Sequence, residues 1–416
     1  MEYAYSYSMR YFLLLLSAVT LFVSCSTDDH RRRKEVGQQE STLPSTNTTI
    51  PEQPPVVKLF IENSSSMNGY FNQDDGAKDV RLSLFNLSKQ VDCQSLFFIN
   101  SAVIPAQKDA QTELQQMTLQ DFISYGNKGN VAASDISEVL KTIVDSTAAQ
   151  GEISLLVSDF IFCPSKKNYL AWLGSDAEKS NIQTIFQGKN YVVAIMQLDA
   201  YFSGSFFTGH FDKKGCETNY KIKQKRPYYI WAIGGESEID WFIKHIDMER
   251  IGVANSICIV NSDKALDYHL ISLKGSYDID RRDNKHAENA KFGKNGFVLD
   301  FVADIKSLPL PTSYLYNKEN YATSDANYVV DTIFESNDKT HIRFRGQKIK
   351  AGNVSVYLKN NLPSWVMQHS MDDPEWDIRN IGNENRTYGL QALIEGVRDA
   401  KTSTSDNYVT FKFKIN

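Results

Sequence analysis

The sequence lacks a clustered excess of positive charge, because 45 Lys and Arg residues face 50 Asp and Glu residues and the formal net charge is −5. Binding to nucleic acid depends on a basic face that neutralises phosphates, so the charge balance argues against a nucleic-acid partner. The chain also has no Gly-x-Ser-x-Gly turn, no phosphate-binding Walker loop and no His-Glu-x-x-His pair. These absences argue against the commonest hydrolase, nucleotide and zinc-protease sites.

Cysteine is scarce, with five residues in a chain of 416. Cys258 lies in the apolar run Ser256–Val260 and is expected in the core. A Cys163–Cys216 disulfide remains open, because the spacing alone does not fix a pairing. His210 shares a loop with Cys216, but the arrangement does not favour zinc, and His245 is expected to be an ordinary helix residue. The cysteines whose pairing is left open are Cys93, Cys163, Cys216 and Cys258.

The N-terminal region has the pattern of an export signal. The apolar run Tyr11–Val23 follows Arg10 and is shorter than the roughly 20 residues that cross a bilayer. Ser24 directly before Cys25 resembles the cleavage box of bacterial lipoproteins, in which the cysteine is acylated. An ordinary signal peptide with an incidental cysteine is the alternative. We therefore predict a signal peptide over residues 1–24 and lipidation at Cys25.

Residues 25–55 are rich in Ser, Thr, Gln, Glu and Pro and have no hydrophobic period, which predicts a flexible tether. Asp28 and Asp29 resemble the surface-export signal of Bacteroidetes lipoproteins. The resemblance implies an outer-membrane lipoprotein that contacts the membrane only through its lipid. Whether the body lies at the cell surface or on the periplasmic face stays open.

Residues 56–262 alternate apolar runs with amphipathic stretches. Nearly continuous apolar runs are typical of strands buried on both faces of a parallel sheet, and the stretches between them have helical spacing. The pattern predicts an α/β domain with a Rossmann-like, doubly wound, mostly parallel sheet. The predicted strands are Val56–Ile61, Leu96–Ile99, Ile153–Val157, Tyr191–Met196, Tyr228–Ile233 and Ser256–Val260, and the predicted helices are Val80–Gln90, Asp135–Ala149, Asp176–Gln187 and Glu236–Ile246.

Residues 263–416 read as a second, mainly antiparallel domain of the β-sandwich kind. Clear alternation of apolar and polar residues appears in Val409–Ile415. Only Leu390–Val397 has helical spacing. The other predicted strands are Phe297–Val302, Tyr328–Phe334, His341–Phe344 and Val354–Leu358.

The first predicted strand runs into Glu62-Asn63-Ser64-Ser65-Ser66-Met67. An acidic residue followed by Ser-x-Ser after a buried strand resembles the metal-ion-dependent adhesion site of von Willebrand factor A domains. Ser134, just before a predicted helix, and Asp159, at the end of a predicted strand, occupy the places of the family's later metal-site residues. The chain departs from the family at Glu62, where Asp is usual, and at Phe160, where Gly is usual.

The resemblance implies a Rossmann-like domain that binds Mg²⁺, or Mn²⁺ or Ca²⁺, through Glu62, Ser64, Ser66, Ser134 and Asp159. The residue chemistry agrees, because Mg²⁺ prefers oxygen ligands and keeps several waters. Glu62 and Asp159 are also expected at the carboxyl ends of parallel strands, where open α/β sheets place their ligands. The alternative is structural: Ser64, Ser66 and Ser134 can cap helices, and Asp159 can bond loop amides.

Two further segments have the composition of binding or catalytic sites. The stretch Tyr201–Phe207 contains Gly204 and Ser205, which favours an exposed contact loop. Packing of this stretch beneath the second domain is the alternative. The candidate contact residues are Tyr201, Phe202, Phe206 and Phe207. The stretch Asp372–Asp377 concentrates carboxylates beside Trp376, which predicts an acidic turn, with a calcium loop or a glycosidase pair as alternatives.

The sequence therefore favours a non-enzymatic envelope lipoprotein that binds a protein or glycan ligand through a divalent ion. A structural subunit of an envelope assembly with a degenerate metal site is the first alternative. An envelope hydrolase using the acidic stretch Asp372–Asp377 is the second.

Overall fold

A computed structural model describes residues 54–72, 76–130, 135–147, 151–161, 175–211, 217–262, 264–293, 296–373, 376–402 and 406–416. The predicted signal peptide, the lipidation site Cys25 and nearly all of the tether lie outside these residues, as do Cys163, Cys216 and Ser134. Residues Gln53–Asn416 belong to one compact unit. The domain boundary predicted at residue 262 stays a prediction.

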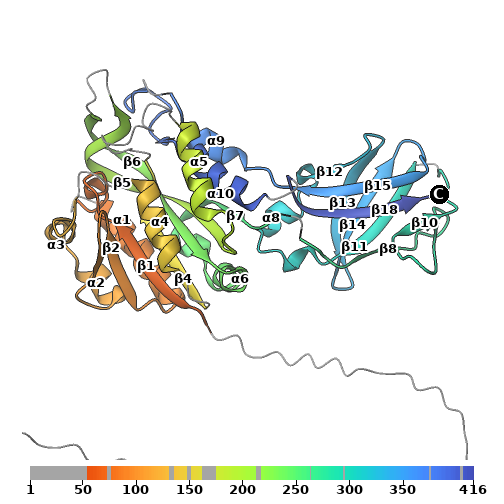
Figure 1. Cartoon of the computed structure of the whole chain (residues 1–416), viewed down its shortest axis with the longest axis horizontal. Helices are drawn as coiled ribbons and strands as arrows, with labels where there is room; N and C mark the ends of the chain where they lie inside the picture. The colour runs from red at the N-terminus through yellow and green to blue at the C-terminus, as the bar shows by residue number, and fades with distance from the viewer. Residues whose placement is uncertain are drawn as a thin grey trace, which may run out of the picture. The chain divides into compact units, whose positions relative to one another are not determined.

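A seven-stranded sheet forms the centre of the α/β part (Figure 1). All six predicted strands are confirmed, although two of them are much longer than predicted. The strand order is β3-β2-β1-β4-β6-β5-β7. The strands are β1 (Val56–Glu62), β2 (Ser95–Ile99), β3 (Val103–Pro105), β4 (Glu152–Ser158), β5 (Val192–Phe211), β6 (Glu217–Gly234) and β7 (Val253–Ile259).

The sheet is mixed, so the prediction of a mostly parallel sheet is wrong. Among its described strands, only the pairs β1–β2 and β1–β4 are parallel. Strands β5 and β6 pair antiparallel from Val192 and Gly234 to Phe211 and Glu217, as consecutive strands of a hairpin must. Their apolar runs misled the prediction, because a strand covered on both faces is apolar whichever way its neighbours run.

Helices pack on this sheet, and the four predicted ones are confirmed. Helix α4 buries the predicted apolar face, and Asp135 caps it by accepting the Ser137 amide at 3.1 Å. The N-cap of this helix is therefore Asp135, and Ser134, predicted to cap it, lies outside the described residues. The helical segments of this part are η1 (Met67–Tyr70), α1 (Gly76–Gln90), α2 (Ala110–Gln116), α3 (Leu119–Gly126), α4 (Ile136–Ser146), α5 (Ser175–Phe186), α6 (Glu236–His245) and α7 (Met248–Ile251).

Among the described residues beyond 263, two larger sheets are mainly antiparallel, as predicted, and a third is a two-stranded parallel pair. One of the larger sheets has the order β12-β15-β18-β10-β9 and the other β13-β14-β11-β8. Phe301 of β11 contacts Phe411 and Phe413 of β18, with ring centroids 5.0 and 4.7 Å apart. The strands are β8 (Tyr268–Ile271), β9 (Asp278–Ile279), β10 (His286–Glu288), β11 (Phe297–Ala303), β12 (Tyr321–Thr323), β13 (Tyr328–Ser336), β14 (Lys339–Gly346), β15 (Gly352–Lys359) and β18 (Asn407–Ile415).

The segment between β15 and β18 returns to the central sheet. Helix α10 (Leu390–Lys401), which the sequence predicted, lies beside α5 (Figure 1). Lys179 of α5 pairs with Glu395 at 3.1 Å and with Asp399 at 2.8 Å. The remaining short elements are η3 (Ile305–Ser307), α8 (Thr312–Leu315), η4 (Lys318–Asn320), α9 (Ser364–His369), β16 (Ser370–Met371) and β17 (Thr387–Tyr388).

Candidate metal centre

The candidate site lies where β1 and β4 end. The two strands are parallel neighbours, with Ile61 opposite Val157. Strand β2 pairs with the other edge of β1, so the chain order reverses across β1. Open α/β sheets bind ligands at the carboxyl ends of strands on either side of such a reversal. Glu62 and Asp159 therefore meet at the edge that this rule favours.

Glu62 is the last residue of β1 and is buried, with 3% of its surface exposed. The Ser158 hydroxyl donates a hydrogen bond to the Glu62 carboxylate. The same hydroxyl oxygen accepts the Phe160 amide at 2.8 Å. Ser158 thus ties the end of β1 to the turn that follows β4.

Asp159 follows β4 and is equally buried. Its Oδ1 accepts the Ile161 amide at 3.2 Å, whereas Oδ2 is enclosed and accepts no hydrogen bond from a described residue. Burial and then the charge of Glu62 raise the pKa of Asp159, and the Ser66 hydroxyl, the Ile161 amide and Arg226 lower it less. The two carboxylates therefore oppose each other's ionisation.

The serine hydroxyls of the motif lie in the turn after β1. Ser64 Oγ and Ser66 Oγ are 2.9 Å apart and share one hydrogen bond. Ser64 is 7% exposed, and Ser66 is partly buried. The structure thus brings four of the predicted ligands to one edge of the sheet, and the fifth, Ser134, lies outside the described residues.

The described residues fit a hard divalent cation. Two carboxylates and two hydroxyls offer only oxygen donors, which suit Mg²⁺, Mn²⁺ or Ca²⁺. Asp159 Oδ2 is buried without a hydrogen bond, a state that costs free energy unless a cation or a proton compensates it. The two carboxylates are enclosed by the protein, because Glu62 and Asp159 are each 3% exposed.

Phe160 explains how the turn after β4 is held. Its φ is +50°, in the left-handed region, where glycine is the least strained residue. Its ring stacks on Trp231 of β6 with centroids 4.5 Å apart and planes at 13°. Phe160 therefore keeps the backbone conformation that glycine takes easily, and its ring contact offsets the strain.

Arg226, which precedes the apolar run of β6, was not among the predicted site residues. Arg226 is 1% exposed and donates to the backbone carbonyls of Glu384 and Arg386, the latter at 2.6 Å. Its guanidinium lies 4.5 Å from the centroid of the Phe206 ring. Burial lowers its pKa, and its charge lowers that of Asp159. Arg226 ends a run of basic residues that includes Lys221, Lys223 and Lys225, so nothing in the local sequence distinguished it as the buried one.

The predicted contact loop Tyr201–Phe207 is wrong, because this stretch is part of β5. Phe202 and Phe206 are fully buried, while Tyr201 and Phe207 are partly exposed. Gly204 does not break the strand. It lets β5 pass close to Gly69, since a Cβ on Gly204 would lie 3.0 Å from the Gly69 Cα.

The other candidate residues have ordinary structural contacts where they are described. Asp377 pairs with Arg379 at 2.6 Å, and Pro374 and Glu375 lie outside the described residues. His245 stacks on Trp241 with centroids 4.3 Å apart. Cys258 is buried in the core as predicted, and burial raises the pKa of the Cys93 thiol to about 11.

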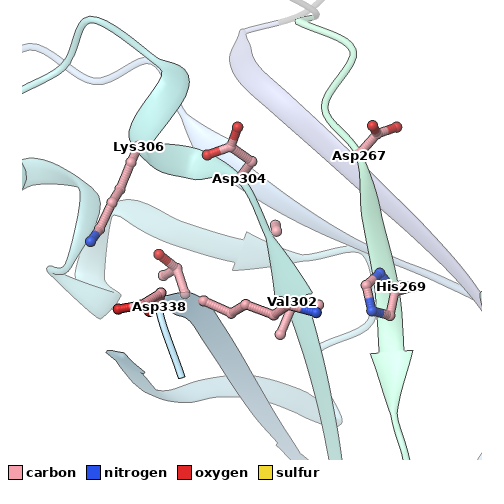
Figure 2. A pocket seen from close by; sticks show the side chains of 9 residues that line it. Asp267, His269, Val302, Asp304, Lys306 and Asp338 are labelled. Carbon is pink, nitrogen blue, oxygen red and sulfur yellow. The ribbon is translucent and has the colours of Figure 1, made fainter. Parts of the chain in front are cut away.

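A hollow of about 250 Å³ lies at one end of the sheet that contains β8 and β11. Asp267 and His269 lie on one side, and Asp304, Lys306 and Asp338 on the other (Figure 2). Lys306 pairs with Glu335 at 2.5 Å. The hollow is separate from the carboxylate pair Glu62–Asp159, and its mixed charges select no ligand class.

Comparisons with known protein families, with curated proteins and with solved structures find no match to the chain. Among the residues that the structure describes, no helix combines the length and apolarity needed to cross a membrane.

Proposed function

We propose that the protein is a cell-envelope lipoprotein whose α/β part binds a protein or glycan ligand and holds a divalent cation at Glu62, Ser64, Ser66 and Asp159. The carrying observation is the buried carboxylate pair Glu62–Asp159, with Oδ2 of Asp159 bonded to no described residue. A bound ion at this edge would supply positive charge and an open position for an acidic group of the partner.

The fold supports this proposal in its finer details. The unit β1–α1–β2 and the parallel strand β4 on the other side of β1 are consistent with a Rossmann-like half sheet, to which the β5–β6 hairpin adds antiparallel strands. The contacts of Phe301 with Phe411 and Phe413 are consistent with a β-sandwich of the two other sheets.

The mutual repulsion of the two buried carboxylates favours a neutralising partner at this site. Two unit charges about 5 Å apart repel by roughly 3 kcal/mol at an effective dielectric constant of about 20. Arg226 offsets part of this repulsion, but its guanidinium donates to the backbone carbonyls of Glu384 and Arg386. The pair is therefore neutralised by a shared proton or by a divalent ion.

Thermal melting in a titration with MgCl₂ or MnCl₂ separates these two states. The wild-type midpoint should rise as the ion exceeds its dissociation constant. Asp159→Asn should melt above the wild type in chelator, because the repulsion is gone, and below it at saturating ion. The matched control Asp145→Asn changes an exposed carboxylate of α4 and should follow the wild type.

Two results would contradict the proposal. A wild-type midpoint that does not move at millimolar ion would remove the cation and favour a structural subunit with a degenerate site, a role with which Arg226 beside Asp159 agrees. A shift that survives in Asp159→Asn would remove the ligand assignment.

A further inference from the structure

A second group of ligating side chains lies far along the chain, on the hairpin β9–β10. Ala287 pairs with Ile279, and the Asp280 amide donates to the His286 carbonyl at 3.0 Å. Alternate residues of a strand share a face, so His286 and Glu288 lie on one face, with Asp280 across from His286. The hairpin register thus gathers these three side chains.

The three side chains can reach one ion. One ligand atom from each of Asp280, His286 and Glu288 lies within 4.8 Å of the others. The His286 Nδ1 is 3.2 Å from Asp280 Oδ2, and the imidazole is 8% exposed. One imidazole and two carboxylates form a mixed nitrogen and oxygen set, which suits Zn²⁺, Co²⁺ or Mn²⁺ better than Mg²⁺.

A separate contact orients the imidazole through its other nitrogen, Nε2. His286 Nε2 lies 2.8 Å from the side-chain nitrogen Nδ2 of Asn416. The oxygen and nitrogen of an asparagine side chain occupy interchangeable positions. When the oxygen faces the ring, Nε2–H donates to Asn416 and the Nδ1 lone pair faces the carboxylates. A ligating histidine that donates its other N–H to an oxygen is the usual outer shell of a metal site.

The charges of the group also suit a divalent cation. The Arg282 amide donates to Asp280 Oδ1 at 2.8 Å, and Asp280 Oδ2 faces the His286 ring at 3.2 Å. The Glu288 side chain is partly buried and forms no ion pair with another described residue. Arg281 and Arg282 are exposed and Lys285 lies 3.9 Å from the Tyr268 ring centroid. A divalent ion with two carboxylates and a neutral imidazole makes a neutral centre.

We propose that Asp280, His286 and Glu288 bind a divalent transition-metal ion, with Zn²⁺ as the best match, which fastens the short edge strand β9 to β10. This site is independent of the oxygen site at Glu62 and Asp159, because it uses a histidine and lies on a different sheet.

Metal titrations of the whole folded chain test this site. Zn²⁺ should compete with a chromophoric chelator, and Co²⁺ should give visible absorption bands without the intense near-ultraviolet band of a cobalt–thiolate bond. His286→Gln and Glu288→Gln should each weaken Zn²⁺ binding at least about tenfold, by analogy with ligand-shell substitutions. His245→Gln is the matched control, since that ring stacks on Trp241, and it should bind as the wild type does.

The variants also separate the two sites. Asp159→Asn should leave Zn²⁺ binding unchanged, and Glu288→Gln should leave the Mg²⁺-dependent melting shift unchanged. Glu288 is partly exposed, so its variant keeps the test decisive if His286→Gln unfolds, and circular dichroism checks both. Wild-type affinity in Glu288→Gln, a cobalt–thiolate band, or the absence of protein-dependent Co²⁺ bands would each overturn the assignment.

Discussion

Glu178 gives the sharpest test of the electrostatics, because it is a carboxyl group buried between two helices. It lies on α5, is 2% exposed, and accepts a hydrogen bond from the Ser137 hydroxyl of α4. Burial raises the pKa of Glu178 from 4.5 to about 7, against the opposing effect of the Ser137 hydrogen bond. We expect the substitution Glu178→Gln to stabilise the protein at neutral and alkaline pH.

The sign follows from proton binding. Between pH 4.5 and about 7 the folded state holds the Glu178 proton more tightly than the unfolded state does. The free energy of unfolding of the wild type therefore falls as the pH rises through this window. The shift of the pKa corresponds to about 3 kcal/mol at pH 8. Glutamine keeps the carbonyl that accepts the Ser137 hydroxyl, and it removes the buried charge.

Urea denaturation at pH 5, 6, 7 and 8 measures the difference between Glu178→Gln and the wild type, in which all shared titrations cancel. The difference should be small at pH 5 and should grow in favour of the variant to about 1–3 kcal/mol at pH 8. Glu138→Gln, on the exposed face of α4, should give a flat difference. A flat difference for Glu178→Gln, or a more stable wild type at pH 8, would refute the reasoning.

Three other substitutions test the packing and the buried amine. Gly396→Ala should destabilise the protein by about 1–3 kcal/mol in urea denaturation, because the new Cβ would lie 2.7 Å from the Ile182 Cβ. This loss should exceed the roughly 1 kcal/mol by which alanine favours a helix over glycine. A gain in stability would contradict the close contact between α10 and α5. Lys401 is buried, and burial lowers its pKa from 10.5 to about 8. Between pH 8 and 10.5 the unfolded state therefore binds this proton more tightly, so the free energy of unfolding of the wild type should rise with pH. That rise should be smaller in Lys401→Met. Phe160→Gly relieves the strain of a left-handed backbone but removes the stack on Trp231. We expect a lower melting temperature, because loss of a buried aromatic side chain costs about 3–5 kcal/mol. An unchanged melting temperature would mean that the relieved strain is as large as the lost packing.

The sequence located the elements of the central sheet well, because burial on both faces leaves a clear trace. The runs Val56–Ile61 and Ile153–Val157 form neighbouring parallel strands, and the sequence pattern alone predicts Glu62 and Asp159 at their carboxyl ends. The direction of β5 and β6 was beyond the same reasoning. An apolar run records how much of a strand is covered and not which way its neighbour runs.

Long-range contacts account for most of the other differences. Gly204 looked like a loop residue, but its small size serves the approach of β5 to Gly69. The sequence around Arg226 did not indicate its hydrogen-bond acceptors, because these are the carbonyls of Glu384 and Arg386, over 150 positions away in the chain. Local composition carries no information about such distant partners.

The packing of α10 on α5 has a consequence for how the chain folds during synthesis. A polypeptide leaves the ribosome from its N-terminus, and domains generally fold in that order. Here α5 emerges early, but Gly396 and Glu395, which pack against it or pair with it, follow only after the two β-rich sheets have almost all been made. The nascent α/β part must therefore keep this face of α5 uncovered until α10 has been synthesised.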